Sequence, residues 1–225
     1  MPSAREDILS RLRRAVAQQP TFPNRPQAPY LPVTRLAPDE DLKARFIAEV
    51  ERVKGTVHVA PDDAAARRTL RELLAGRNAQ RVTMWDEAHI PLPGVTALLQ
   101  ELGIERIQGS NAEVATADAG ITGADWAIAT TGTLVLSSGP GKPRMASLLP
   151  PVHIAVLTED RIVPRLEDYI AAQRAQRLGV FRRSSNVTLI TGSSRTSDIE
   201  MHPVFGVHGP LELHVILIEN LSEMG

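Results

Sequence analysis

The sequence contains no cysteine, which excludes disulfide bonds, cysteine nucleophiles, and iron–sulfur clusters or zinc ions bound by its own thiolates. Long apolar runs are also missing, since the stretch from Leu213 to Ile218 is far shorter than a membrane span. The charged residues Arg5, Glu6 and Asp7 stand where a signal peptide would need its apolar segment. We therefore expect a cytoplasmic protein without a membrane span.

An excess of charge of one sign is missing as well. The chain has 25 Lys and Arg against 26 Asp and Glu, a formal net charge of −1. A nucleic-acid or anionic-membrane partner would require a basic excess, so neither is expected. The hydrophobic content of 43% is typical of globular proteins. A chain of 225 residues can bury about 70% of its unfolded surface, enough for one core.

Residues 1–37 differ from the rest of the chain. A capping box at Ser3 and Glu6, followed by an apolar stripe through Leu12 and Val16, predicts a helix. Six prolines then fall between positions 20 and 38. Because proline fixes φ and removes a hydrogen-bond donor, they predict an extended arm. This arm either lies on a surface, its own or a neighbour's, or is a flexible linker.

Residues 38–225 have the pattern of an α/β domain. Strands expected at 56–60, 81–85 and 104–108 alternate with helices, which predicts a mostly parallel sheet flanked by helices. The second half favours a hairpin of residues 121–129 and 133–137. Three buried strands are also expected there, at 152–157, 187–190 and 213–218.

Three polar, glycine-containing segments follow predicted strands. Because ligands bind outside the carboxyl ends of strands in open α/β sheets, we expect the segments to share one crevice. The first consists of Thr130, Thr131, Gly132 and Thr133. Its hydroxyl and N–H groups suit an anion whose charge Lys142 or Arg144, further along, would balance. On the residues alone, an ordinary hairpin turn is favoured.

The second segment, residues 191–200, is dense in groups that bind anions: Ser193, Ser194, Arg195 and Thr196 are all candidate substrate-binding residues. If this segment is extended, Thr196, Asp198 and Glu200 share one face. Asp198 and Glu200 are then candidate catalytic carboxylates. Alternatively, Asp198 pairs with Arg195 and only holds the loop.

The third segment, residues 206–210, contains His208 and the candidate binding residue Gly209. Histidine titrates near neutral pH, so His208 is a candidate acid or base. Asp198, Glu200, His202 and His208 offer metal ligands, but their spacing matches no tight metal motif and we predict no metal site. For His153, a hydrogen-bonded structural role is favoured.

Several of these motifs together resemble the lactate-utilisation protein C (LutC) family, whose members carry a LUD domain. The resemblance extends from about residue 38 to residue 218 and rests on four motifs, at 120–133, 147–154, 191–200 and 206–210. Family members often have Gly-Pro-Ser-Arg-Thr where this chain has Gly-Ser-Ser-Arg-Thr from Gly192 to Thr196.

This resemblance implies a fold similar to that of sugar-phosphate isomerases and coenzyme A transferases. It also implies a role in oxidising L-lactate to pyruvate beside two partner proteins that carry iron–sulfur clusters. The lack of cysteine agrees with clusters held only by partners and with no cofactor in this chain. The family implies no established set of catalytic residues.

Three functions compete on this basis. The first is a non-redox subunit or accessory of lactate oxidation with a small-anion site. The second is a free-standing enzyme acting on a phosphorylated or acyl substrate, with Glu200 or Asp198 as base or nucleophile and Arg195 as anion clamp. The third is an assembly module whose N-terminal helix and arm reach another subunit, for example in a homo-oligomer.

Overall fold

The structure is a computed structural model that describes residues 4–18, 34–197, 203–205 and 209–219. The chain divides into two compact units, Met1–Val33 and Thr34–Gly225. In the first unit, the expected helix is present as α1, Ala4–Ala17. Its apolar stripe is exposed, with exposed fractions of 58%, 56% and 67% for Ile8, Leu12 and Val16. Residues 19–33 of the predicted proline-rich arm lie outside the described residues.

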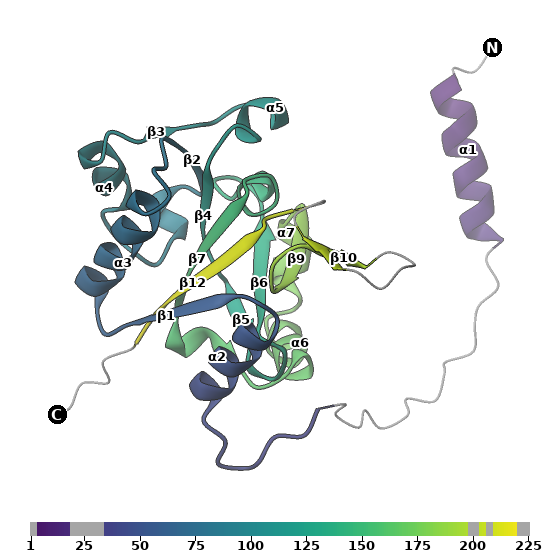
Figure 1. The fold of residues 1–225 in the computed structure, drawn as a ribbon. Coiled ribbons are helices and arrows are strands. Elements are labelled where there is room, and N and C mark those ends of the chain that lie inside the picture. Colours follow the sequence, from purple (N-terminus) through teal and green to yellow (C-terminus); the bar gives the residue numbers. More distant parts are fainter. Residues whose placement is uncertain (1–3, 19–33, 198–202, 206–208, 220–225) are drawn as a thin grey trace. The chain divides into compact units, whose positions relative to one another are not determined.

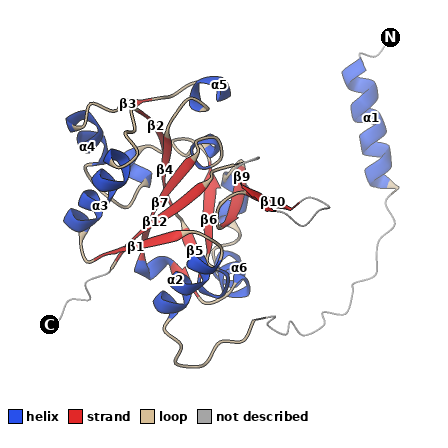
Figure 2. Cartoon of the chain, viewed as in Figure 1, coloured by secondary structure: helices blue, strands red, loops and turns tan. Residues whose placement is uncertain are grey.

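The second unit is built around a six-stranded parallel sheet (Figures 1 and 2). Its strands follow one another across the sheet in the order β1 (Thr56–Ala60), β12 (Glu212–Ile218), β7 (Val152–Thr158), β4 (Ala119–Gly123), β2 (Arg81–Met84) and β3 (Glu105–Arg106). The central strands are buried along nearly their whole length, as their continuous apolar sequences require. The predicted α/β class and mostly parallel sheet are confirmed.

Helices cover both sides of this sheet. They are α2 (Leu42–Arg52), α3 (Asp63–Ala75), α4 (Val95–Glu101), α5 (Asn111–Val114), α6 (Leu166–Ala175) and α7 (Gly179–Arg183). Aspartates begin the two longest of them in this unit. Asp41 accepts hydrogen bonds from the first-turn N–H groups of α2, and Asp62 accepts one from Ala65 of α3. Figure 1 shows α3 and α4 on one side of the sheet, opposite α6 and α7.

A second sheet of four strands lies between the main sheet and α6 (Figure 1). Its order is β8 (Ile162–Val163), β5 (Trp126–Ile128), β6 (Thr133–Ser138) and β9 (Asn186–Thr191). Strands β5 and β6 form the predicted hairpin around the 3-10 turn Ala129–Thr131. Two further strands, β10 (Arg195–Ser197) and β11 (Pro203–Phe205), pair antiparallel with each other.

Two expectations about these strands were wrong. The predicted strand 121–129 is two strands, because the chain leaves the main sheet after Gly123 and enters the second sheet at Trp126. The segment 187–190 was expected to be buried, but β9 is the edge strand of the second sheet and Leu189 is 46% exposed. An edge strand pairs on one side only, so water reaches its other side.

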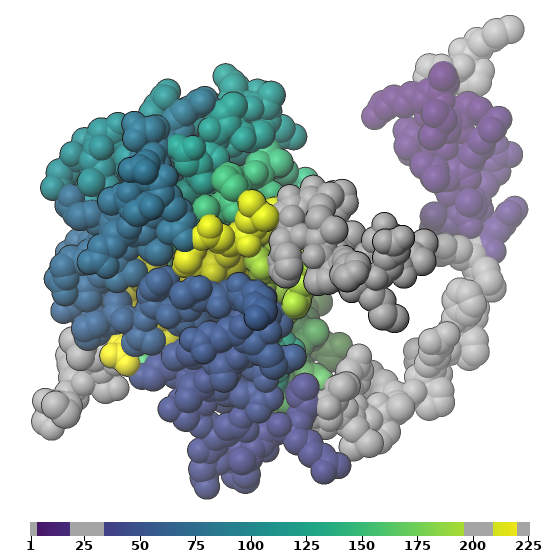
Figure 3. Space-filling model, in the orientation of Figure 1, coloured from purple at the N-terminus to yellow at the C-terminus, as the bar shows by residue number. Residues whose placement is uncertain are grey.

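One large apolar core joins the two sheets. It includes Phe46 of α2, Leu70 of α3, Trp85 after β2 and Leu134 of β6, together with the central parallel strands. A smaller cluster of Ile128, Val135 and Tyr169 packs the far face of the second sheet against α6. In the space-filling view, earlier segments of the chain cover most of the last strand, β12 (Figure 3).

Candidate functional site

The second and third predicted segments line one cavity of about 280 Å³, which we call the amino-end cavity. Its wall contains Ser193, Ser194, Arg195 and Gly209. Leu213 and His153, near the first residues of β12 and β7, form its floor on the main sheet. The cavity therefore lies at the amino ends of these two strands.

This location differs from the expected one at the carboxyl ends of the strands. The segment that begins at Thr191 follows a strand, as predicted, but that strand is β9 of the second sheet. Since β9 runs antiparallel to β6 and lies outside the parallel sheet, its carboxyl end is free to meet the amino ends of β7 and β12.

Backbone contacts hold the cavity wall in place. The Ser194 N–H donates to the Pro210 carbonyl at 2.8 Å, which ties the second segment to the third. Gly192 has a φ of +77°, and a Cβ atom there would lie 2.4 Å from the Val53 carbonyl oxygen. Glycine is thus needed at this position for both conformation and space. Ser193 is buried, whereas Arg195 is exposed at the rim.

His153 is a buried polar group in the cavity wall. One ring nitrogen, Nε2, lies 2.9 Å from the Thr122 hydroxyl, whereas Nδ1 has no hydrogen-bond partner among the described residues. The hydrogen-bonded structural role expected for His153 is therefore met at only one of its two ring nitrogens. Burial lowers the pKa of His153 to about 3, so the ring is neutral at physiological pH.

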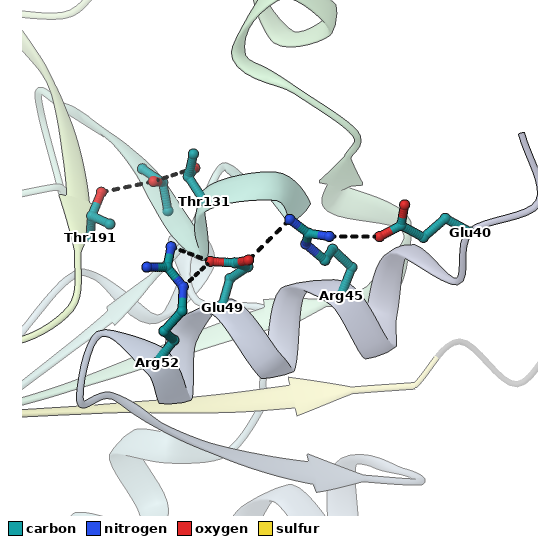
Figure 4. A network of polar contacts seen from close by, with 7 residues as sticks. Glu40, Arg45, Glu49, Arg52, Thr131 and Thr191 are labelled. Carbon is teal, nitrogen blue, oxygen red and sulfur yellow. Dashed lines mark hydrogen bonds and ion pairs between the residues drawn. The ribbon is translucent and has the colours of Figure 1, made fainter. Parts of the chain in front are cut away.

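The Thr130–Thr133 segment makes different contacts. The Thr131 and Thr133 hydroxyls lie 2.7 Å apart, and the Thr133 hydroxyl lies 2.8 Å from that of Thr191 (Figure 4). Gly132 has a φ of +61°, and its α-carbon faces the backbone of α2, where a Cβ atom would lie 2.5 Å from the Val50 nitrogen. The segment thus joins β9 to α2, and its residues are not among those that line the amino-end cavity.

The nearby face of α2 has balanced charges. Glu49 accepts from Arg45 at 3.1 Å and from Arg52 at 2.7 Å, and Arg45 also pairs with Glu40 at 3.0 Å (Figure 4). Because carboxylates already contact both guanidinium groups, this cluster stabilises α2 and offers little attraction to a further anion.

The remaining predicted site residues are not placed. Asp198, Glu200, His202 and His208 lie outside the described residues, as does the side chain of Thr196. Their assignment as catalytic or metal-binding groups stays a prediction. Within the described ranges, no group of three or more His, Asp or Glu side chains is arranged to hold a metal ion.

A second and larger cavity of about 640 Å³, here called the carboxyl-end cavity, was missed by sequence reasoning. It lies where β4 and β7 end, and its wall includes Asp125 and Thr158. Asp125 stands two residues after the end of β4, within the range 121–129 that was expected to be a single strand, and Lys142 was expected only to neutralise an anion at the first segment. These were the local signals for it. Its other walls come from residues 88–91, residues 137–140, α6 and α7, and no local pattern connects these segments to β4.

The fold and these cavities define an α/β protein whose main sheet is parallel, with one cavity at the amino ends and one at the carboxyl ends of its strands. The model of the LUD domain family matches residues 43–218. The chain belongs to this family, as the resemblance of its motifs predicted.

Relatives and a solved structure agree with that assignment. The lactate utilization protein C of Exiguobacterium sp. is 31% identical over 228 residues, 96% of each chain. That of Halalkalibacterium halodurans is 35% identical over 148 residues, and the match spans 64% of its length. A crystal structure of a DUF162 family protein from Deinococcus radiodurans superimposes with a TM-score of 0.59 at 27% identity, covering 79% of this chain and 96% of that one. No helix in the described part of this chain is long and apolar enough to cross a membrane.

Proposed function

We propose that this chain acts in lactate utilisation as a cytoplasmic, non-redox subunit or accessory that binds a small anion in the amino-end cavity. The observation that carries this proposal is the convergence of Ser193, Ser194, Arg195 and Gly209, from two separate segments, on one cavity. The names of the relatives support lactate utilisation. The lack of cysteine supports a division in which iron–sulfur proteins of the same system carry the electrons.

The chemistry of the cavity suits a 2-hydroxy acid such as L-lactate. A guanidinium group binds a carboxylate through two parallel hydrogen bonds, which is a role for Arg195 at the rim. The hydroxyls of Ser193 and Ser194 supply further donors, and Leu148 and Leu213 offer an apolar wall for a methyl group. A volume of about 280 Å³ suits a small metabolite better than a coenzyme.

Ligand binding to the purified chain tests the anion site. L-lactate, pyruvate, D-lactate and phosphate would be compared by thermal shift on wild type, Arg195→Ala and the control Arg174→Ala, which removes an exposed arginine of α6. A ligand at a hundred times its Kd stabilises by about 2.7 kcal/mol, which raises the Tm by about 5–11 °C. We expect this shift in wild type and Arg174→Ala and its loss in Arg195→Ala. No shift, or the same shift in Arg195→Ala, would refute the site.

A separate experiment tests the role. Deletion of the gene should abolish growth on L-lactate, and cluster-bearing proteins should co-purify with the tagged chain. Unchanged growth together with no such partner contradicts the proposed role. Turnover of a phosphorylated or acyl substrate by the purified chain alone would instead support a free-standing enzyme.

A further inference from the structure

The carboxyl-end cavity has the position and size of a ligand site. It lies outside the carboxyl ends of β4 and β7, where open α/β sheets bind their ligands. Its volume of about 640 Å³ falls within the range of about 300–1,000 Å³ typical of small-molecule and cofactor sites. Nothing in the proposed lactate role uses this space.

The charges in the wall favour an anionic ligand. The one carboxylate in the wall, Asp125, is already compensated, because it lies 2.5 Å from the Lys142 ammonium and accepts from the N–H and the hydroxyl of Ser137 at 2.6 Å each. Two further cations, Arg161 and Arg183, line the same cavity. Arg161 pairs with Asp160 at 3.4 Å, whereas Arg183 forms no ion pair with a described residue.

Two largely buried polar side chains line the wall of the cavity. Gln173 of α6 is 3% exposed and Ser138 of β6 is 6% exposed, and both line the cavity. Neither side chain makes a hydrogen bond to another described residue. The polar atoms of these side chains are not fully enclosed, so they are open to hydrogen bonds with a ligand in the cavity. An amide offers donors and acceptors side by side, which matches the edge of a nitrogen heterocycle.

A cation–aromatic pair, Arg161 and Trp126, borders the cavity. The guanidinium of Arg161 lies 5.6 Å from the centre of the Trp126 ring, and this ring packs edge-on against the buried Tyr169. A guanidinium and an indole are both planar, so either can offer a face on which a heterocycle stacks.

We propose that the carboxyl-end cavity binds a mononucleotide, with its phosphate on Arg183 and the edge of its base on the Gln173 amide. The Arg161 and Trp126 pair positions the base, and the Asp125–Lys142 pair closes the polar wall. This site is separate from the amino-end cavity, because the two cavities lie at opposite ends of the strands of the main sheet.

Isothermal titration of the full chain with AMP tests this proposal. Adenosine, ribose 5-phosphate and inorganic phosphate would be titrated beside it. The key variants are Arg183→Gln and its neighbour Arg182→Gln, an exposed arginine that does not line the cavity. Since a hydrogen bond to a charged group is strong, we expect Arg183→Gln to weaken AMP binding by about ten- to a hundredfold and Arg182→Gln to leave it unchanged. Adenosine and ribose 5-phosphate should each bind more weakly than AMP.

Two more variants separate this site from the proposed lactate site. Gln173→Leu should weaken AMP binding and leave that of inorganic phosphate unchanged, whereas Arg195→Ala should not affect AMP. No heat with millimolar AMP would overturn the proposal, as would AMP binding that Arg195→Ala abolishes and Arg183→Gln does not. Ribose 5-phosphate binding as tight as that of AMP would overturn the role of the base.

Discussion

Replacing Gly132 with alanine should strongly destabilise the protein. Gly132 ends the 3-10 turn of the second sheet with a φ of +61°, in the left-handed region. The new methyl carbon would lie 2.5 Å from the Val50 nitrogen and 2.6 Å from the Glu49 carbonyl carbon. Both are backbone atoms of α2 and cannot rotate away, so the turn and the helix must separate.

The cost has two parts. A left-handed conformation costs an alanine about 1–2 kcal/mol relative to glycine. Overpacking against a rigid neighbour adds about 1–3 kcal/mol. The total of about 2–5 kcal/mol corresponds to a fall in Tm of about 4–20 °C for a chain of this length.

Two other glycines separate these two parts. Gly103 has a φ of +68° but open space around it, so Gly103→Ala should show the conformational part alone. Gly139 has neither a positive φ nor a neighbour within 4 Å, so Gly139→Ala should change stability by less than about 0.5 kcal/mol. Urea denaturation of the three variants gives the free energies. If Gly132→Ala costs no more than Gly103→Ala, the turn does not press on α2 and the packing argument is refuted.

Three further predictions concern buried side chains. Burial lowers the pKa of His153 from 6.5 to about 3, so as the pH falls below 6.5 the histidine is protonated in the unfolded chain before it is protonated in the folded chain. At pH 5 this difference lowers the free energy of unfolding by about 2 kcal/mol in wild type, and His153→Gln should not show this loss. Urea denaturation at several pH values measures it, and equal pH slopes for the two proteins would contradict the prediction. Asp125→Asn leaves the half-buried Lys142 ammonium without its carboxylate and should lower the free energy of unfolding by about 1–3 kcal/mol. An unchanged Tm would show that the pair contributes nothing to stability. Phe46→Ala empties a fully buried site on α2 and should lower the free energy of unfolding, measured by urea denaturation, by about 3–5 kcal/mol. A loss below about 1 kcal/mol would place this side chain outside the core.

Local sequence patterns were sufficient for the strands at the centre of the sheet. The predicted range of β1 agrees at both ends, and those of β7 and β12 differ by one residue. These strands are continuous apolar runs between polar or glycine residues, so burial on both faces leaves a clear local signal. Patterns of this kind do not say which strands pair. The split of 121–129 into β4 and β5 depends on partners 30 or more residues away in β7, which periodicity does not reveal.

The two cavities also differ in how much of each could be predicted from local sequence patterns. The amino-end cavity was found in part because Ser193, Ser194 and Arg195 are consecutive and their density is visible in the sequence. The carboxyl-end cavity is lined by short runs of residues from many segments between Ala88 and Ser184. None of those segments is unusual by itself, so only the folded chain shows that they meet.

The place of β12 in the sheet affects how the protein is made. This last strand lies between β1 and β7, two strands that are synthesised long before it. From the end of β7 at Thr158 to the start of β12 at Glu212, a ribosome adding about 5–20 residues per second needs about 3–11 seconds. During that interval β1 has no partner in the main sheet, and one edge of β7 stays open to pairing with another chain. The nascent chain therefore passes through a period in which unpaired strand edges expose it to aggregation.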